Sequence, residues 1–362
     1  MKKYFFCGIT LVFLFFSCNR SNQCDLLEIP VDIDQNILLP LSEITEEITA
    51  IELELTDESM LSPNSVKRII IYENEVFISN LHRIFVFDLK GKYIRSIGSL
   101  GQGPGEYSTL KSFALDEKNK RIFVASYMRK NILYDLNGKF LKENYFLEGI
   151  MEDIYYINGE LFAINQKSTK SDSDELSSHA SFCRFNENFQ IIDSCTIRHL
   201  IVKNPSGSLW RDATYILKDR ESIYLYYGDY FDRKNYGEKV LCDTLYRFEN
   251  NHLIPDLKLD FSNKGIHNFI KLYNIYRSSR YVFSVYENQQ RKETYVFCYD
   301  TKTGKGYNMQ DGYIDDIHGI DNKFIIRPFN QDTEMFYYLH TNMNPDDLEE
   351  PNPTLYIGRL KK

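Results

Sequence analysis

The sequence predicts an all-β protein built from one repeated unit. Beyond residue 36 the chain is a succession of short alternating or β-branched runs separated by turn residues, and no long stretch has the 3.6-residue periodicity of a helix. Two consecutive units follow the same pattern: Val66–Ser79 with Arg83–Ile97, and Ser112–Ser126 with Asn131–Tyr145. Each unit has room for four short strands in roughly 40–50 residues, which is typical of a β-propeller blade.

A shared turn motif joins the two outer strands of these units. The motif Asp-Leu-x-Gly-Lys begins at Asp88 in the first unit and at Asp135 in the second. Gly91 and Gly138 can adopt positive φ without steric cost, so we expect a tight turn at each. The run Tyr299–Gly304 repeats this turn chemistry, and the repeat therefore extends towards the C-terminus.

Four further units continue the pattern with more divergence. They are Asp153–Asn165 with Ser181–Cys195, Ala213–Tyr227 with Thr244–Asp260, Lys271–Tyr286 with Glu293–Met309, and Ile314–Arg327 with Met335–His340 and Thr354–Leu360. We therefore predict a six-bladed β-propeller of four-stranded antiparallel blades. Stacking the blades around an axis buries faces that a single four-stranded sheet would leave open.

The segment Glu43–Leu55 is predicted to close this ring. Its apolar residues alternate ahead of the first unit, as in a half-buried strand. We expect it to complete the last blade beside Thr354–Leu360, which would place both ends of the chain in one sheet.

The N-terminus has the features of a bacterial lipoprotein signal. Lys2 and Lys3 precede the apolar run Tyr4–Phe16, which is too short to cross a hydrocarbon core of about 30 Å as a helix. Ser17 before Cys18 resembles a lipobox, with cleavage before Cys18 and lipid attached to it; the alternative is a plain secretory peptide with an incidental cysteine. We divide the chain into a lipoprotein signal peptide (residues 1–17), a polar tether (18–36) and the propeller (37–362).

Composition excludes some classes of function. The net charge of −8 argues against nucleic acid as a partner, because phosphate binding needs clustered basic residues. The sequence contains no Cys-x-x-Cys pair, so it gives no support for a zinc or redox site. Cys183 and Cys195 flank a predicted hairpin asymmetrically, so we expect buried free thiols rather than a disulfide.

Three segments resemble the six-bladed β-propeller lipoproteins abundant in Bacteroidetes, which are similar to NHL-repeat propellers. They are the glycine-rich segment Gly98–Tyr107, the strand Ile48–Leu55 and the run Leu241–Tyr246. The resemblance covers roughly Ile37 to Leu360. It implies a propeller located in the cell envelope, and it implies no established reaction.

The expected location is the outer membrane, reached through the lipid on Cys18. In Bacteroidetes lipoproteins an acidic cluster after the lipidated cysteine is associated with export to the cell surface. The segment Asn19–Gln23 has no such cluster. We therefore favour the periplasmic side over the cell surface.

Two groups of residues are candidates for a ligand-binding face. The segment Gly101–Gly105 superficially looks like a phosphate loop, but it contains Pro104 and precedes a strand, so we interpret it as a loop between the first two blades. We expect Glu106 to accept backbone hydrogen bonds in this loop and Tyr107 to pack beneath it. Such loops lie on the face where propellers usually bind ligands.

The second group is Trp210, Arg211 and Asp212, just before the inner strand of the fourth unit and on the same predicted face. Trp210 could stack on a sugar or a peptide, or it could plug the space between blades. Arg211 and Asp212 could orient a polar ligand.

Motifs for catalysis and metal binding are lacking in the sequence. It contains neither a His-x-x-x-His pair nor a Gly-x-Ser-x-Gly elbow, and it singles out no pair of carboxylates for glycoside hydrolysis. An acidic group near the last unit lacks the spacing of a calcium loop and is interpreted as solvated turn residues. Its members are Asp311, Asp315, Asp316 and Asp321, with His318.

These observations favour a non-catalytic, envelope-anchored binding or scaffolding module for a glycan, a peptide or an envelope protein. The alternative is a glycan-active hydrolase or lyase with a site assembled at the propeller channel. We expect a monomer that meets the membrane only through its lipid and that uses no metal and no cofactor.

Overall fold

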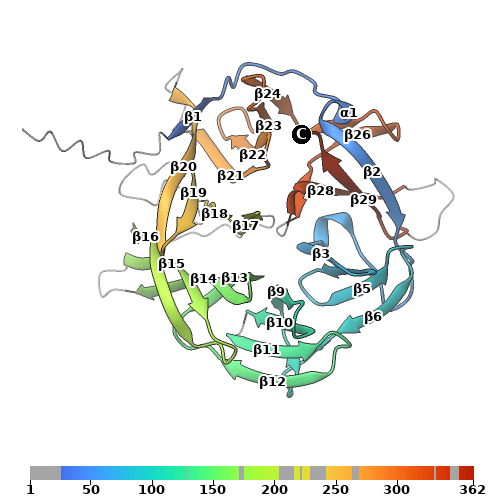
Figure 1. The fold of residues 1–362 in the computed structure, drawn as a ribbon, viewed down its shortest axis with the longest axis vertical. Coiled ribbons are helices and arrows are strands. Elements are labelled where there is room, and N and C mark those ends of the chain that lie inside the picture. Colours follow the sequence, from blue (N-terminus) through green and yellow to red (C-terminus); the bar gives the residue numbers. More distant parts are fainter. Residues whose placement is uncertain are drawn as a thin grey trace, which may run out of the picture.

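The structure is a computed structural model that describes residues 26–127, 129–170, 175–203, 216–220, 222–228, 242–262, 269–329, 332–342 and 350–362. Within these residues it contains five four-stranded sheets, one five-stranded sheet and two small two-stranded sheets. The large sheets follow one another around a central axis in chain order (Figure 1). This arrangement defines a β-propeller, so the predicted all-β propeller architecture is confirmed.

The first three large sheets are regular antiparallel units. Sheet one contains β3 (Arg68–Tyr72), β4 (Glu75–Ser79), β5 (Ile84–Asp88) and β6 (Tyr93–Ile97); sheet two contains β9 (Leu110–Asp116), β10 (Arg121–Ser126), β11 (Lys130–Asp135) and β12 (Phe140–Tyr145); sheet three contains β13 (Ile150–Ile157), β14 (Glu160–Lys170), β15 (Glu175–Phe185) and β16 (Ile191–Lys203). In each sheet the first strand lies nearest the axis and the last lies at the rim (Figure 1).

The other three large sheets each include strands from the second half of the chain. Sheet four contains β17 (Ile216–Asp219), β18 (Ser222–Leu225), β19 (Thr244–Glu249) and β20 (His252–Asp260), with β1 (Leu27–Pro30) at its edge; sheet five contains β21 (Ile270–Arg277), β22 (Tyr281–Asn288), β23 (Glu293–Asp300) and β24 (Lys305–Gln310); sheet six contains β27 (Arg327–Phe329), β28 (Asp332–His340), β29 (Thr354–Leu360) and β2 (Thr45–Glu52). A one-turn helix, α1 (Leu41–Ile44), and a 3₁₀ turn, η1 (Pro63–Ser65), flank β2.

The turn motif forms as predicted. Asp88 Oδ1 accepts hydrogen bonds from the amides of Lys90 (2.8 Å) and Lys92 (2.9 Å), and Gly91 has φ of 84°. Asp135 makes the same pair of contacts in sheet two, where Gly138 has φ of 86°. Each turn therefore needs both the carboxylate and the glycine.

The N-terminal strand β2 pairs antiparallel with β29, in a register running from Thr45 opposite Leu360 to Glu52 opposite Thr354. The strand β2 and the C-terminal strand β29 therefore share sheet six. The strand is shorter than Glu43–Leu55 because its first residues form α1.

Sheet six differs from the prediction at its inner edge. The segment Ile314–Arg327 was expected to supply its first strands, but β25 (Tyr313–Asp315) and β26 (Ile320–Phe324) pair with each other in a separate small sheet. The Asp315 carboxylate accepts hydrogen bonds from the amides of the turn between them, including that of His318 at 2.8 Å. This local turn fixes a short hairpin and leaves β27 as the inner strand.

The segment ahead of β2 belongs to the folded body. The expected tether reaches residue 36, yet β1 pairs parallel with β20, and Ile29, Val31 and Ile33 are buried. The chain then crosses the rim of sheet five, where the Ile37 amide donates to the Asn308 carbonyl (2.8 Å). Alternating apolar residues explain this correction, because they give the segment a buried side.

The core lies between neighbouring sheets. Separate clusters of buried apolar side chains fill the interfaces of sheets one and two, two and three, three and four, and six and one, and a larger cluster joins sheets four, five and six. Cys183, Cys195, Cys242 and Cys298 are free thiols, and all but Cys195 are buried. Among the described residues, no helix has the length and apolar character needed to cross a membrane.

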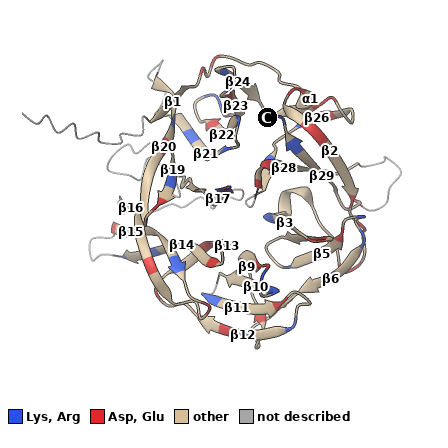
Figure 2. Ribbon diagram, viewed as in Figure 1, with Lys and Arg blue, Asp and Glu red and all other residues tan. Residues whose placement is uncertain are grey.

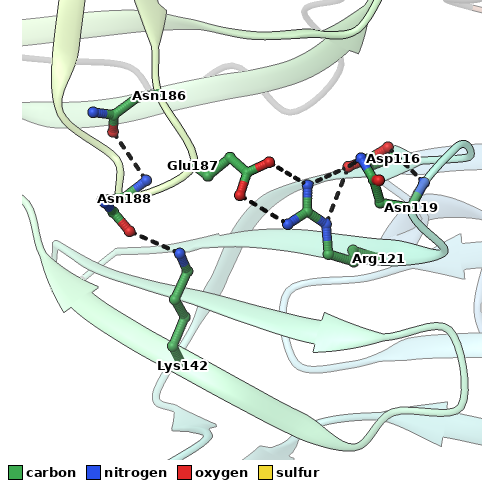
Figure 3. A network of polar contacts seen from close by, with 7 residues as sticks. All are labelled: Asp116, Asn119, Arg121, Lys142, Asn186, Glu187 and Asn188. Carbon is green, nitrogen blue, oxygen red and sulfur yellow. Dashed lines mark hydrogen bonds and ion pairs between the residues drawn. The ribbon is translucent and has the colours of Figure 1, made fainter.

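A polar clamp adds to the apolar contact between sheets two and three (Figure 3). The Arg121 guanidinium bonds Asp116 (2.6 Å) in its own sheet and Glu187 (2.8 Å) in the β15–β16 turn. Beside it, Lys142 Nζ donates to Asn188 Oδ1 (2.8 Å). Elsewhere on the ring, acidic and basic residues are interspersed (Figure 2).

Candidate functional site

A cavity of about 820 Å³ lies where the inner strands of the first four sheets converge. Its lining comes from β3, β9, β13 and β17 and from the turns that follow β9 and β13. The strands surround the axis in Figure 1, so residues far apart in the sequence share one chamber, which we call the central cavity.

Arg68, the first residue of β3, lines this cavity although it is only 8% exposed. Its Nη1 donates to the carbonyls of Phe113 in sheet two and Ile154 in sheet three, both at 2.6 Å, and its Nη2 pairs with Asp153. Burial lowers the pKa of Arg68, but the combined effect of Asp153, Tyr155 and Tyr337 is larger and leaves the pKa above its ordinary value. Arg68 thus ties three sheets together while remaining charged.

The partners of Arg68 are themselves bonded. Asp153 accepts hydrogen bonds from Ser112 Oγ (2.5 Å) and from the Tyr155 hydroxyl. The Arg68 guanidinium also lies 4.3 Å from the centre of the Tyr155 ring, in a cation–π contact. Burial and Asp153 both raise the pKa of Tyr155 well above its ordinary value. We call these four residues the floor; they form an internally neutralised network, of which Arg68 and Tyr155 line the cavity.

The upper part of the central cavity has a different chemistry. Half-buried Tyr72 and Tyr156 contribute aromatic rings, and Tyr156 stacks on Phe123 with ring centres 5.7 Å apart. Lys118 and Lys218 also line it, and no carboxylate of the described residues pairs with either amine. The cavity therefore offers aromatic surface and free positive charge above a neutral floor.

The turn between β13 and β14 completes the wall. Asn158 and Gly159 both have positive φ, at 52° and 84°, and both line the cavity. A Cβ atom added at Gly159 would meet no heavy atom within 4 Å. The backbone is therefore open to a ligand at this turn.

The sequence-predicted candidates Glu106 and Tyr107 lie elsewhere. As expected, Glu106 Oε2 accepts a hydrogen bond from the Gly103 amide (2.9 Å), and Tyr107 is buried, with its hydroxyl bonded to the Ile97 carbonyl (2.8 Å). Their loop is further held by Lys130, whose Nζ donates to the Gly103 carbonyl (2.6 Å). These two residues brace the loop between sheets one and two.

The loop and the central cavity lie at opposite ends of β9. The loop precedes Leu110, whereas the cavity is lined by Leu115 and by Glu117 and Lys118 just beyond the strand. A seven-residue strand spans roughly 20 Å. Glu106 and Tyr107 are absent from the described cavity lining, and their assignment to a ligand face stays a prediction. Trp210, Arg211 and Asp212 lie outside the described residues.

The acidic group near the last sheet is partly structural. Asp315 is 1% exposed and bonds the Tyr338 hydroxyl, so it is a buried anchor rather than a solvated turn residue. Asp316 accepts a hydrogen bond from the Ser42 amide (2.9 Å) and fixes α1. The described part of the chain brings together no group of three or more His, Cys, Asp or Glu side chains suited to a metal ion.

Sequence reasoning missed the residues of the floor. One signal was available: Arg68 begins the otherwise apolar run Arg68–Tyr72, and Asp153 interrupts the apolar residues of its strand. A charged residue in an inner strand needs a buried partner. The sequence could not identify that partner, because Arg68 and Asp153 are 85 positions apart.

Comparison with known proteins gives a family. The family described as "Domain of unknown function (DUF4934)" matches residues 26–356. The chain belongs to this family. The match begins at residue 26, so the DUF4934 domain includes β1 as well as the sheets.

Comparison with solved structures gives one match that supports the fold and others that are more distant. A "putative exported protein" from Bacteroides fragilis superposes with a TM-score of 0.65 at 19% identity, over 93% of this chain and 100% of the other. BamB from Moraxella catarrhalis gives 0.44 at 8% identity, over 87% and 99% of the two chains. The Pan2 WD40 domain from Neurospora crassa gives 0.43 at 12% identity, over 82% and 76%. No curated protein matches the sequence.

Proposed function

We propose that this protein is a lipid-anchored, six-bladed propeller of the cell envelope that binds a short glycan in its central cavity. One observation carries this proposal. The central cavity combines the rings of Tyr72 and Tyr156 with two lysines, Lys118 and Lys218, that pair with no carboxylate of the described residues. Sugars present apolar ring faces that stack on aromatic side chains and hydroxyls that bond polar groups. The cavity volume of about 820 Å³ lies within the usual range for ligand sites, about 300–1,000 Å³.

The floor favours binding over catalysis. Arg68, Asp153 and Tyr155 are engaged with one another, and the pKa shifts of Arg68 and Tyr155 keep both protonated at neutral pH. Canonical glycoside hydrolysis uses two carboxylates, whereas Glu117 is the one acidic residue among the described cavity lining. The hypothesis of a hydrolase or lyase therefore has less support than the binding hypothesis.

The rest of the proposal concerns the ring and its anchor. Six large sheets support six blades, and the pairing of β2 with β29 supports closure of the last blade by the N-terminal strand. The lipobox-like Cys18 supports a lipid anchor, with the periplasmic side favoured, as in the Bacteroidetes lipoproteins that the sequence resembles. The exported description of the Bacteroides fragilis neighbour is in line with this location.

The binding proposal is tested with the full chain purified in detergent. A glycan array identifies bound sugars, and titration calorimetry then measures affinity for the best one. The combined change Lys118→Ala and Lys218→Ala should weaken binding at least tenfold, whereas the matched change Lys90→Ala and Lys139→Ala, at exposed turns outside the described cavity lining, should not. An array without bound sugar, or a cavity variant that binds like wild type, would refute the proposal.

The anchor is tested separately. Cys18→Ala should move the protein from the membrane to the soluble fraction, and mass spectrometry of the N-terminal peptide should lose the acyl chains. Protease treatment of intact cells then distinguishes the two sides of the outer membrane, because a periplasmic domain is protected. Membrane retention of the variant would contradict lipid anchoring at Cys18.

A further inference from the structure

Sheet three is extended beyond its neighbours. Strands β14, β15 and β16 have 11, 11 and 13 residues, whereas β10, β11 and β12 have six each. The pairing of β15 with β16 continues from Phe185 opposite Ile191 to Glu175 opposite Lys203.

Two histidines face each other in the extended parts of β15 and β16. His179 on β15 is the direct register partner of His199 on β16. Their ring centres are 5.8 Å apart with an interplanar angle of 58°. His199 is exposed and His179 is half-buried, so both rings are accessible to an ion from solvent.

We propose that His179 and His199 bind a divalent transition-metal ion, with Cu²⁺ preferred. A ligating imidazole nitrogen lies about 2.0–2.1 Å from its metal, which places the ring centre about 3.2 Å from the ion. The centres of two rings that bind one ion are therefore at most about 6.4 Å apart. The observed distance of 5.8 Å between the ring centres of His179 and His199 is inside that limit. Small side-chain rotations bring one nitrogen of each ring to a common point without moving the strands.

The preference for Cu²⁺ follows from the donor set. Imidazole nitrogen suits copper, nickel and zinc, and copper forms the strongest complexes in the divalent series. Ser177 Oγ lies 2.9 Å from His199 Nε2 and is a neutral neighbour rather than a competing anion. The described residues add no third His, Cys, Asp or Glu ligand, so water would fill the other positions and the ion would exchange readily.

Metal binding would brace the hairpin. The extended parts of β15 and β16 are held together by their cross-strand pairing. An ion bound by one histidine from each strand adds a further link between the two strands. The site lies outside the described lining of the central cavity and is independent of any glycan bound there.

The test uses the full chain in detergent, stripped with EDTA and titrated with Cu²⁺ alone at pH 7.5. Calorimetry should show a site in wild type that His179→Gln and His199→Gln each weaken at least tenfold. His252→Gln is the matched control, since His252 is exposed in sheet four and its ring bonds the Asn250 carbonyl. Electron paramagnetic resonance of the Cu²⁺ complex should show two nitrogen donors in wild type and in the control.

Thermal melts separate loss of the site from loss of the fold. All proteins should melt alike in EDTA, and Cu²⁺ should raise the midpoint for wild type and for the control but not for the two site variants. A variant with a lowered midpoint in EDTA is replaced by His→Asn at the same position. Equal binding by wild type and both variants, or a loss on one histidine alone, would overturn the two-ligand site.

Discussion

The two faces of the ring use their polar groups differently. On the loop face, defined by Gly98–Tyr107, Lys130 is buried and bonds the Gly103 and Glu106 carbonyls and Glu143. On the cavity face, defined by the turns that follow β9 and β13 and by the β17 residue Lys218, Lys118 and Lys218 pair with no described carboxylate.

The glycines of the two faces differ in the same way. A Cβ atom on Gly98 would lie 2.5 Å from the Tyr107 ring and 2.7 Å from the Tyr134 hydroxyl, whereas one on Gly159 would meet nothing within 4 Å. The loop face, whose sequence is distinctive, is a packed brace. The cavity face, whose sequence is ordinary, is the one open to a ligand.

The largest expected effect is at the cavity floor. Arg68→Ala should lower the free energy of unfolding by about 3–5 kcal/mol, because Asp153 would remain buried without its partner. Guanidinium chloride denaturation measures this loss. The double change Arg68→Met and Asp153→Leu should recover most of it, since apolar residues can replace a buried pair. A single variant that loses less than about 1 kcal/mol would show that the floor is not a buried ion pair.

The next effect compares the two glycines directly. Gly98→Ala should lower the free energy of unfolding by about 2–4 kcal/mol. This loss combines the strain of a positive φ with overpacking against two tyrosines. Gly159→Ala should lower the free energy of unfolding by about 1–2 kcal/mol, because the positive φ strains the backbone there but no neighbouring atom is crowded. Urea denaturation of both variants checks the difference, and equal losses would refute the contrast between the faces.

A smaller effect compares two lysines. Lys130→Met should lower the free energy of unfolding by about 2 kcal/mol, because it removes the buried amine that bonds the Gly103 and Glu106 carbonyls and pairs with Glu143. Lys118→Met should change it by less than about 0.5 kcal/mol, as expected for a surface substitution. Thermal melts of the two variants measure these shifts. A larger loss for Lys118→Met would mean that this lysine holds the fold rather than facing a ligand.

The smallest effect is pH-dependent and lies at an anchor of sheet five. A hydrogen-bonded pairing with Arg280 lowers the pKa of Asp300 to about 2. A lowered pKa stabilises the folded protein above the ordinary carboxyl pKa, near 4, and this contribution is lost as pH falls from about 4 to 2. Asp300→Asn should therefore cost about 1 kcal/mol at pH 7, limited by solvent screening, and nothing near pH 2. Denaturation at both pH values checks this, and a pH-independent loss would contradict it.

The strands and turns were predictable because their causes are local. Period-two alternation predicts β2 and the strands of the first five sheets other than β1, and the Asp-Leu-x-Gly-Lys motif predicts the turns at Gly91 and Gly138. Each of these features is encoded within a window of about ten residues. The small β25–β26 hairpin was missed because a buried carboxylate, Asp315, overrides the strand pattern there.

The sequence by itself therefore determined that this is an all-β repeat protein, which segments are strands and where they turn. The tertiary structure alone decided that β1 joins sheet four, that Arg68 finds Asp153, and that the open cavity lies at the end of the inner strands away from the glycine-rich loop. The reason is physical: hydrogen-bonding and alternation patterns act between near neighbours, whereas a cavity exists only where strand ends from distant parts of the chain converge.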